Sequence, residues 1–438
     1  MHPEEQHSEL ILQRLELYGV RLGLERMQRL LRALGGPQLS IPTVIVAGTN
    51  GKGSTSALLA SMCQTAGYRT GLYTSPHLET VHERVRIGGR AIAEPALAEY
   101  LARAIALAAE LRDEPPTYFE AMTLAAWQCF RDERVDLAVL EVGLGGRLDA
   151  TNASEPKLAV ITQIAHDHED QLGSTLASIA REKAGVMRPE QPVIAWGEHE
   201  EVRATLEREA ASIGARLTFA TDHVRLQGLT ETERGQQIEL ATPSRAYVVD
   251  LPLLGRHQWA NLALATLAAE TLAGQGFPNL GPRAIASGAA ACRWPGRLEW
   301  ITLPDGRMVL LDVAHNPDGI EALAAYLERL ATRIDLLFGA FADKRVERML
   351  PRIAGLAEDL VMTSPPGARA SDPNSWLPLL GERRATVEPD VSRALERALG
   401  SGERPLVVCG SLYLVGLVRG LLRERFGVPE PALEAGTG

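Results

Sequence analysis

Val44-Ile45-Val46-Ala47-Gly48-Thr49-Asn50-Gly51-Lys52-Gly53-Ser54 is the stretch that decides the fold. The apolar residues 44–46 predict a buried strand, and Ser54 and Thr55 open an apolar-periodic stretch that predicts a helix. A strand, a glycine-rich turn with one lysine, and a hydroxyl at the start of a helix together form a phosphate cradle. Backbone N–H groups hold the phosphate oxygens there, Lys52 adds a positive charge, and the Ser54 hydroxyl can bind Mg²⁺.

The stretch departs from the standard P-loop pattern at two positions. Val46 stands where the pattern has its first glycine, and Gly53 separates Lys52 from Ser54. The alternative is an ordinary strand-to-helix turn that is rich in glycine. The strand before it, the helix after it and the lysine inside it favour a phosphate site. The candidate ATP-binding residues are Gly48, Thr49, Asn50, Gly51, Lys52, Gly53, Ser54 and Thr55.

The composition indicates a cytoplasmic, globular protein of two domains. The chain has 438 residues, of which 45% are hydrophobic and 23% charged. Its formal net charge of −10 argues against a general nucleic-acid binder, so an anionic ligand needs a local positive site. The four cysteines lack metal-ligand spacing and are expected to be buried in a reducing compartment. We expect no signal segment and no membrane association, because no apolar run approaches ~18 residues.

Strands alternate with helices along most of the chain, which predicts an α/β fold with mostly parallel sheets. Helical patterns cover 8–34, with a break near residues 19–23, and 95–111, 118–131 and 259–274, while 72–93 is expected to be a loop. Strands are expected at 136–142, 158–164 and 193–195, and short alternating segments in 213–254 predict a small antiparallel patch.

A second, smaller α/β domain is expected after the linker Pro295-Gly296. Its predicted strands are 308–312, 335–338, 359–362 and 405–409, followed by a helix at 412–426. We therefore expect an N-terminal P-loop-like ATPase domain over 1–294 and a C-terminal Rossmann-like domain over 295–438.

Two strand ends in the first domain carry possible metal ligands. Glu141 ends an apolar strand, and glycines follow it where a ligand would need close backbone approach. A Mg²⁺ ion could bridge Glu141, Ser54 and phosphate oxygens, although an ordinary surface acid is the alternative. His168 follows the next strand and could complete the site. Lys183 ends a helix, where it is either a solvated charge or reaches back into the site.

Asp312 and His315 follow the strand predicted at 308–312. Asp312 could bind a ribose hydroxyl, and His315 could contact a substrate. Asn316-Pro317-Asp318-Gly319 is expected to form a turn. Arg297, after the linker, could contact a phosphate group.

Eight segments in order resemble one family, the folylpolyglutamate and dihydrofolate synthases of the Mur ligase superfamily. The run Glu-Val-Gly-Leu-Gly-Gly-Arg-Leu-Asp-Ala-Thr-Asn at 141–152 is the most specific of them. His166 and His257 depart from the family pattern but do not touch the segments that carry the resemblance. The eight segments are 48–54, 75–77, 118–120, 141–152, 167–168, 182–185, 295–297 and 312–317.

The resemblance implies the roles of individual residues. Lys52 and the loop amides would bind ATP phosphates, with Asn261 on the adenine side, Arg297 on a phosphate and Asp312 on the ribose. Mg²⁺ would be bound by Ser54, Glu141 and His168, and Lys183 would match a lysine that can be carbamylated to hold a second Mg²⁺. Phe119 would pack on a pterin ring, and the substrate side would include Ser75, His77, Asp149 and His315.

The reaction implied is ATP-dependent ligation of L-glutamate to dihydropteroate, to a folate, or to both. The residues implied in catalysis are Lys52, Glu141, His168, Lys183 and His315, and we expect a monomer. Three alternatives stay open: a Mur-type amino-acid ligase acting on a UDP-linked substrate, a nucleotide-switch ATPase that makes no amide, and a nucleotide-binding scaffold. The second α/β domain and the 312–317 segment favour a ligase over the switch ATPase, and the set of Lys52, Ser54 and Glu141 argues against the scaffold.

Overall fold

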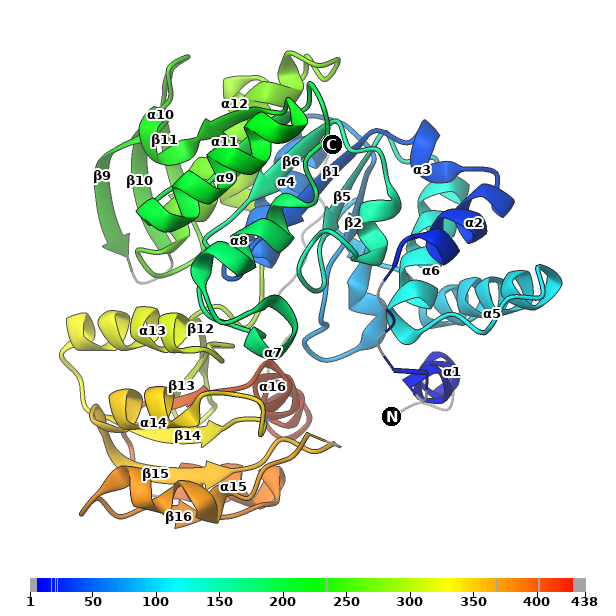
Figure 1. Ribbon diagram of the computed structural model, residues 1–438. Helices are drawn as coiled ribbons and strands as arrows, with labels where there is room; N and C mark the ends of the chain where they lie inside the picture. The colour runs from blue at the N-terminus through cyan, green and yellow to red at the C-terminus, as the bar shows by residue number, and fades with distance from the viewer. Residues whose placement is uncertain are drawn as a thin grey trace. The chain divides into compact units, whose positions relative to one another are not determined.

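The computed structural model describes residues 6–427 except 17, 20, 22, 233, 234, 368 and 401 (Figure 1). The chain folds into two compact units. Met1–Pro252 and Gln258–Cys292 make up the first, and Leu253–His257 and Arg293–Gly438 make up the second.

A sheet of eight strands forms the centre of the first unit, in the order β4-β3-β2-β5-β1-β6-β7-β8. The six strands from β2 to β8 in this order run parallel, and β3 and β4 add an antiparallel edge. Every residue of β1 and β5 is buried, as expected for a parallel sheet covered on both faces. The strands are β1 (Thr43–Ala47), β2 (Thr70–Tyr73), β3 (Val85–Ile87), β4 (Arg90–Ala91), β5 (Leu137–Glu141), β6 (Leu158–Ile161), β7 (Pro192–Ala195) and β8 (Arg216–Phe219).

The expectation that 72–93 forms a loop was wrong. The segment contains the end of β2, the 3₁₀ helix η1 (Val81–Arg84), and the hairpin of β3 and β4. Gly88 and Gly89 both have positive φ, which is the requirement of the two-residue hairpin turn whose twist matches its strands. The strands β3 and β4 are three and two residues long and each contains an arginine, so they are too short to show apolar alternation.

Helices cover both faces of this sheet (Figure 1). Helix α6 begins where Thr117 and Glu120 form a capping box, and Arg26 pairs with the Glu120 carboxylate. The helices are α1 (Gln6–Glu16), α2 (Glu25–Ala33), α3 (Pro37–Ser40), α4 (Lys52–Thr65), α5 (Glu94–Glu110), α6 (Tyr118–Asp132), α7 (Glu169–Leu172), α8 (Leu176–Ala184), α9 (Glu200–Ile213), α10 (Ala220–His223), α11 (Gln258–Ala273) and α12 (Pro282–Ala291), with the 3₁₀ helix η2 (Ala150–Ala153).

The predicted antiparallel patch is confirmed as the three-stranded sheet β11-β10-β9. It consists of β9 (Arg225–Thr232), β10 (Gly235–Ala241) and β11 (Ala246–Leu251). Burial alternates strictly along β11, with Tyr247, Val249 and Leu251 on the covered face. The alternation that the sequence showed is therefore that of a sheet with one solvated face.

The second unit contains a six-stranded sheet in the order β12-β13-β17-β14-β15-β16. Only β12 runs antiparallel to its neighbour, so the predicted Rossmann-like architecture is confirmed. The elements are β12 (Glu299–Thr302), β13 (Met308–Leu311), α13 (Pro317–Leu330), β14 (Ile334–Gly339), α14 (Val346–Ala354), β15 (Ala357–Thr363), the 3₁₀ helix η3 (Pro373–Leu380), β16 (Thr386–Val387), α15 (Val391–Gly400), β17 (Leu406–Cys409) and α16 (Leu412–Phe426).

Three features of this unit differ from expectation. The edge strands β12 and β16 were not predicted. The Asn-Pro-Asp-Gly segment does not form an isolated turn but begins α13: the Asn316 side chain accepts from the Gly319 N–H at 2.8 Å, and Pro317 occupies the first helical position. Asparagine at the N-cap and proline at the first helical position both favour the start of a helix. These residues are therefore compatible with a helix start as well as with the predicted turn.

A buried ion pair fixes the amino edge of the second sheet. Arg307 and Asp335 are 6% and 1% exposed, and a guanidinium N–H of Arg307 donates to Asp335 at 2.9 Å. Arg307 also donates to the carbonyls of Ala398, at the end of α15, and of Arg404. The Arg404 guanidinium reaches the other Asp335 oxygen at 2.8 Å. Because every partner is hydrogen-bonded, the network satisfies charges that would be costly to bury alone.

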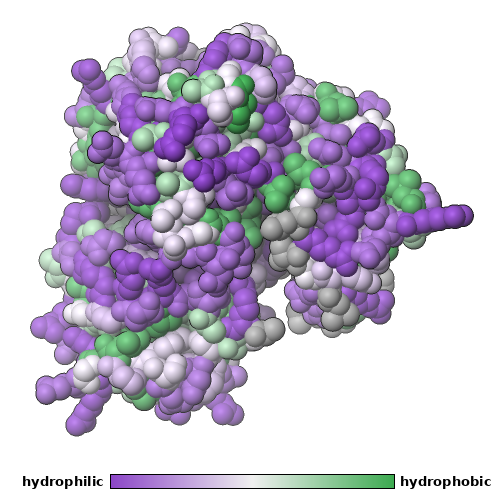
Figure 2. Space-filling model, in the orientation of Figure 1, coloured by the Kyte–Doolittle hydropathy of each residue, from purple (hydrophilic) through white to green (hydrophobic). Residues whose placement is uncertain are grey.

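The surface is ordinary for a globular protein. Hydrophilic residues cover most of the face seen in Figure 2. All four cysteines are buried, as expected. None of the described helices is both long and apolar enough to cross a bilayer.

Candidate functional site

The loop between β1 and α4 is glycine-rich where two side chains pack closely against its backbone. Gly48 and Gly51 have φ of +145° and +87°. A Cβ on Gly48 would overlap the Thr162 hydroxyl, and a Cβ on Gly51 would overlap the Asn261 side-chain oxygen. Both positions therefore require glycine for conformation and for space.

The loop is tied to the segment that follows β6. The backbone N–H groups of Thr49 and Asn50 donate to the Gln163 carbonyl at 2.8 and 3.2 Å. The Thr49 hydroxyl donates to the Ala165 carbonyl at 3.1 Å. Lys52 folds back, with its Nζ 3.0 Å from the Thr49 carbonyl. The loop is thus fixed in position by its own chain.

The other predicted loop residues lie in the first turn of α4. Gly53, Ser54 and Thr55 are buried there, and Thr55 donates to the Asn261 amide oxygen at 3.4 Å. Asn261, on α11, in turn donates to Gln258 at 2.8 Å. Asn261, which is 210 residues from Gly51 in the sequence, therefore lies against Gly51 of the loop.

Lys183 is buried, so the first of its two interpretations, a solvated charge, is wrong. Its Nζ donates to the Gly48 carbonyl at 2.6 Å. Burial, and after it the nearby charge of Lys52, lowers the pKa of Lys183 from 10.5 to about 7, while Asp167 and Asp149 act in the opposite direction. Burial therefore favours the neutral amine at this lysine beside the phosphate loop.

The 141–152 run explains how Lys183 reaches this position. A Cβ on Gly146 would crowd the carbonyls of Glu182 and Lys183, and a Cβ on Gly185 would overlap Arg147. Close approach at these two glycines places the last turn of α8 against the run. The Asn152 amide donates to the carbonyls of Arg147 and Gly185, both at 3.0 Å, and ties the run to the end of the helix.

Glu141 is a buried acid at the carboxyl end of β5, opposite Val46 of β1 in the sheet register. Its Oε2 accepts from the Ser75 backbone N–H at 3.1 Å. The alternative of an ordinary surface acid is therefore wrong. Glu141 thus lies beside the strand that leads into the phosphate loop, and it also contacts the 75–77 segment. It connects the predicted nucleotide site with the predicted substrate segment.

The donor set fits Mg²⁺. Among the described residues, no three His, Cys, Asp or Glu side chains gather into a metal cluster. Mg²⁺ needs no such cluster, because it commonly takes one or two carboxylates and completes its shell with phosphates and water. Glu141 and the buried Ser54 hydroxyl are oxygen donors of this kind. His168 begins α7 in a left-handed conformation, with φ of +52° and a side chain that is 38% exposed.

Asp149 holds the turn of the 141–152 run. Its two oxygens accept from the backbone N–H groups of Gly143, Leu144 and Thr151 and from the Thr151 hydroxyl. Burial raises the pKa of Asp149, and these hydrogen bonds act against that rise. Its predicted role as a substrate contact stays a prediction, and the contacts present show a residue that shapes the backbone.

Phe119 lies directly on this turn. A Cβ on Gly143 would overlap the Phe119 ring, and the ring centroid of Tyr73 is 6.0 Å from that of Phe119. Ser75 and His77 lie in the segment that follows β2, and Arg84 donates to the His77 ring at 3.0 Å. The Phe119 ring thus lies at Gly143, two residues after Glu141, and the segment with Ser75 contacts Glu141 itself.

The second unit carries the remaining predicted residues. Asp312 is buried, and its two oxygens accept from the N–H groups of Leu298 and Ala314, both at 2.9 Å. Burial raises the pKa of Asp312, and the charge of Arg297 opposes this. The His315 Nδ1 is 2.9 Å from the Val313 carbonyl, so Nδ1 carries the hydrogen and Nε2 has the lone pair in the neutral ring.

Ser411 is a candidate site residue that the sequence analysis did not name. It is the N-cap of α16, is 3% exposed, and its hydroxyl has no hydrogen-bond partner among the described residues. Gly410, next to it, donates to the Ala314 carbonyl at 2.9 Å, which brings the end of β17 beside the 312–316 segment. An unpartnered hydroxyl at a helix N-terminus suits an anionic group. Only the Gly410-Ser411 pair before a helix could have signalled it.

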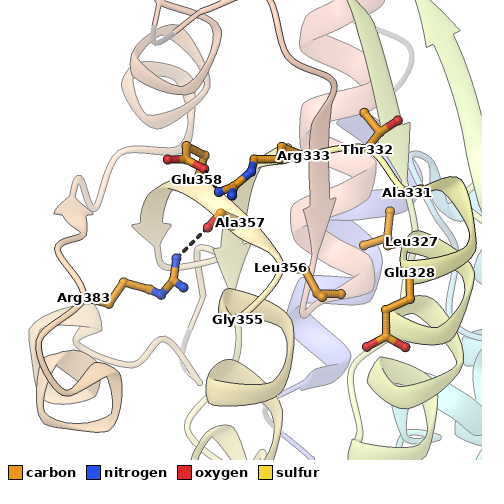
Figure 3. Close-up of a pocket in the computed structure, with 10 residues that line it drawn as sticks. All are labelled: Leu327, Glu328, Ala331, Thr332, Arg333, Gly355, Leu356, Ala357, Glu358 and Arg383. Carbon is orange, nitrogen blue, oxygen red and sulfur yellow. Dashed lines mark hydrogen bonds and ion pairs between the residues drawn. The ribbon is translucent and has the colours of Figure 1, made fainter.

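A hollow of about 450 Å³ lies elsewhere in the second unit (Figure 3). It lies between the end of α13 and the start of β15, where Arg333 pairs with Glu358 and Arg383 donates to the Ala357 carbonyl. Ligands of parallel sheets bind at the carboxyl ends of the strands. The hollow is at the amino edge, opposite the edge that carries Asp312 and His315, so it is not part of the candidate site.

Comparison with known proteins gives two family matches in chain order. The Mur ligase middle domain matches residues 46–269, and the Mur ligase glutamate ligase domain matches residues 296–412. The chain is 35% identical to the dihydrofolate synthase/folylpolyglutamate synthase of Bacillus subtilis, over 93% of this chain and 96% of that protein.

Solved structures agree with this likeness. Folylpolyglutamate synthase of Mycobacterium tuberculosis, complexed with ADP, has a TM-score of 0.87 at 31% identity, over 95% of this chain and 98% of that one. The Escherichia coli protein FolC, in complex with DHPP and ADP, has a TM-score of 0.84 at 32% identity, over 97% and 100% of the two chains.

Proposed function

This chain belongs to the Mur ligase family, in its branch of dihydrofolate and folylpolyglutamate synthases, and is an ATP-dependent ligase; we propose that it joins L-glutamate both to dihydropteroate and to a reduced folate. The observation that carries the proposal is the contact of Glu141 with the Ser75 N–H, because it joins the phosphate side of the site to the 75–77 segment.

On the nucleotide side, we assign the phosphates of ATP to the loop amides of residues 48–53 and to Lys52. Support comes from the positive φ of Gly48 and Gly51 and from the start of α4 directly after them. Asn261 would approach the nucleotide from its position over Gly51. We keep Arg297 and Asp312, which belong to the second unit, as candidate nucleotide contacts because the family resemblance implies them. We retain 1–294 as the ATP-binding domain and 295–438 as the ligase domain.

Mg²⁺ would be held by Ser54 and Glu141, with His168 as a third contact. When bound, the ion would neutralise charge on the transferred phosphoryl group. Lys52 contributes positive charge to the same group from the loop.

Lys183 suits carbamylation because only a neutral amine attacks CO₂. The attack forms an N–C bond, releases one proton and leaves a carbamate, which would be an added carboxylate for a second Mg²⁺. A pKa near 7 keeps a large share of this amine neutral at physiological pH. An unmodified lysine in a fully active enzyme would contradict this assignment.

The chemistry follows from the charge of the reactants. A free carboxylate is a poor electrophile, so its oxygen first attacks the γ-phosphorus of ATP, which gives an acyl phosphate and ADP. The glutamate amine then attacks the acyl carbon, phosphate leaves, and the amine loses a proton. His315 Nε2 is the candidate proton acceptor, and the Ser411 hydroxyl at the α16 N-terminus is a candidate contact for a glutamate carboxylate.

The acceptor would be held by Phe119 on its ring and by Ser75 and His77 on its polar side. Asp149 contributes by shaping the turn on which Phe119 lies. We propose a monomer in the cytoplasm that binds small molecules and neither nucleic acid nor membrane.

The test is phosphate release from Mg-ATP with L-glutamate, comparing dihydropteroate with tetrahydrofolate and identifying products by mass. Ligation with both acceptors would confirm the bifunctional enzyme, and ligation with one would restrict it to that half. Ligation only with a UDP-linked acceptor, or phosphate release without any amide, would refute the proposal. Lys52→Ala should lower turnover ~100-fold or more, whereas Lys157→Ala, at an exposed lysine, should not.

A further inference from the structure

Arg84 is a buried arginine that connects the two elements assigned to the acceptor substrate. It is 6% exposed and ends η1. Its Nε donates to Nδ1 of His77 at 3.0 Å, and its guanidinium carbon is 4.9 Å from the centroid of the Tyr118 ring. Its carbonyl accepts from the Thr74 N–H at 2.9 Å. The guanidinium is thus held between the segment after β2 and the first turn of α6.

The contact with Arg84 determines where the proton of His77 lies. A guanidinium has donors and no acceptor, so the ring nitrogen that it meets must be the acceptor. In a neutral imidazole the other nitrogen then carries the hydrogen, which puts it on Nε2. An imidazolium has a hydrogen on both nitrogens and could not accept from Arg84. The hydrogen bond therefore excludes both the other tautomer and the charged ring.

The charges around His77 act in the same direction. Burial, then Arg84, then His82 lower the pKa of His77 to about 3. Two carboxylates of the surrounding elements have bonds to backbone N–H groups: Glu83 accepts from residues 78–80, and Glu141 accepts from Ser75. From α6, Tyr118 presents its ring to Arg84.

We propose that Arg84 is a positioning residue of the acceptor site, which holds His77 as the neutral Nε2–H tautomer and so makes it a hydrogen-bond donor of fixed orientation. The donor would serve a carbonyl or carboxylate oxygen of the acceptor, and in this respect the inference rests on the proposed function. Stacking on Tyr118 ties the guanidinium to the first turn of α6, which also carries Phe119.

The test is the ¹⁵N spectrum of the histidine rings in the full-length, substrate-free enzyme from pH 5 to 8.5. His77→Gln identifies the signals. We expect a pyridine-type Nδ1 and a pyrrole-type Nε2 that do not change over this range. A hydrogen on Nδ1, or titration near the ordinary value of about 6.5, would overturn the proposal.

Arg84→Met keeps the length of the side chain and removes the donor and the charge. Nδ1 of His77 then no longer meets an obligatory donor, so the ring should lose its single tautomer. The pKa of His77 should rise above its wild-type value, while burial keeps it below the ordinary value of about 6.5. KM for the acceptor should follow that titration, changing about fivefold across it as a neutral hydrogen bond becomes a charged one, with kcat little changed. A His77 that titrates while KM stays flat would overturn the role in acceptor binding.

Two further variants keep the test decisive. Arg90→Met removes an exposed arginine of the adjoining hairpin and should leave both the spectrum and KM unchanged. Arg84→Lys retains the charge without the planar fork and should partly restore the wild-type spectrum if Arg84→Met does not fold. The spectrum needs no substrate, so an enzyme with the expected tautomer but no ligase activity would refute the proposed function and leave the Arg84–His77 arrangement standing.

Discussion

Lys183→Met should stabilise the protein at neutral pH while it removes activity. The fall of the Lys183 pKa from 10.5 to about 7 means that keeping this amine charged in the folded state costs about 4–5 kcal/mol at pH 7. Methionine removes that cost and fills a similar volume. It also leaves the Gly48 carbonyl without its 2.6 Å donor, which costs about 1–3 kcal/mol. We therefore expect a net gain of about 2 kcal/mol.

The pH dependence separates this effect from ordinary repacking. The folded-state pKa lies below the unfolded one, so the unfolded state binds more protons between pH 7 and 10.5, and wild-type stability rises with pH over that range. The advantage of the variant should be full below pH 7 and should vanish toward pH 10.5. Only the lost hydrogen bond remains there.

Urea unfolding of both proteins and of the control Lys157→Met, in bicarbonate-free buffer from pH 6 to 10, measures this difference. A constant difference over the whole range, or a variant that is less stable at pH 6, would refute the reasoning. Turnover should fall ~100-fold or more, because a preorganised group at the phosphate loop is lost.

Three other perturbations follow from the contacts described. Gly48→Ala should abolish nucleotide binding, because its Cβ would overlap Thr162 at a φ that alanine rarely adopts; near-normal ADP affinity by calorimetry would contradict this. Glu141→Gln should reduce ligation ~100-fold or more while circular dichroism and Tm stay close to those of the wild type; ordinary turnover would remove Glu141 from the site. Arg307→Ala should destabilise the second unit by about 3–5 kcal/mol, whereas Arg307→Met combined with Asp335→Leu should cost less, and equal losses in chemical denaturation would show that the charge pair is not the cause.

Much of the fold was predictable because its signals are local. The five buried residues of β1 and the glycines after them identify a strand and a phosphate loop without any knowledge of neighbours. The alternation that survives in β11 also identified the antiparallel patch. The hairpin of β3 and β4 was missed because its strands are too short for periodicity, and its only signal was the Gly88-Gly89 pair.

The site was less predictable because burial is decided by distant contacts. Nothing near Lys183 in the sequence distinguishes it from a solvated lysine. It is buried because the glycines at 146 and 185 let two backbones approach, and because Asn152 then ties the run to α8. Asp149 shows the reverse case. The motif suggested a substrate contact, which stays a prediction, and the sequence did not show that both carboxylate oxygens accept hydrogen bonds within the turn.

The departures from the standard P-loop pattern follow from the same contacts. Val46 is fully buried inside β1 between β5 and β6, so a glycine at that position would leave a gap in the sheet. Glycine is required instead at Gly48, because the Thr162 hydroxyl occupies the space that a Cβ would need. The Gly48 carbonyl also accepts a hydrogen bond from Lys183. The position of a glycine in such a loop is therefore set by the side chains that approach it. A loop with a different spacing can form the same cradle when its neighbours come from other elements, as β6 and α8 supply them here.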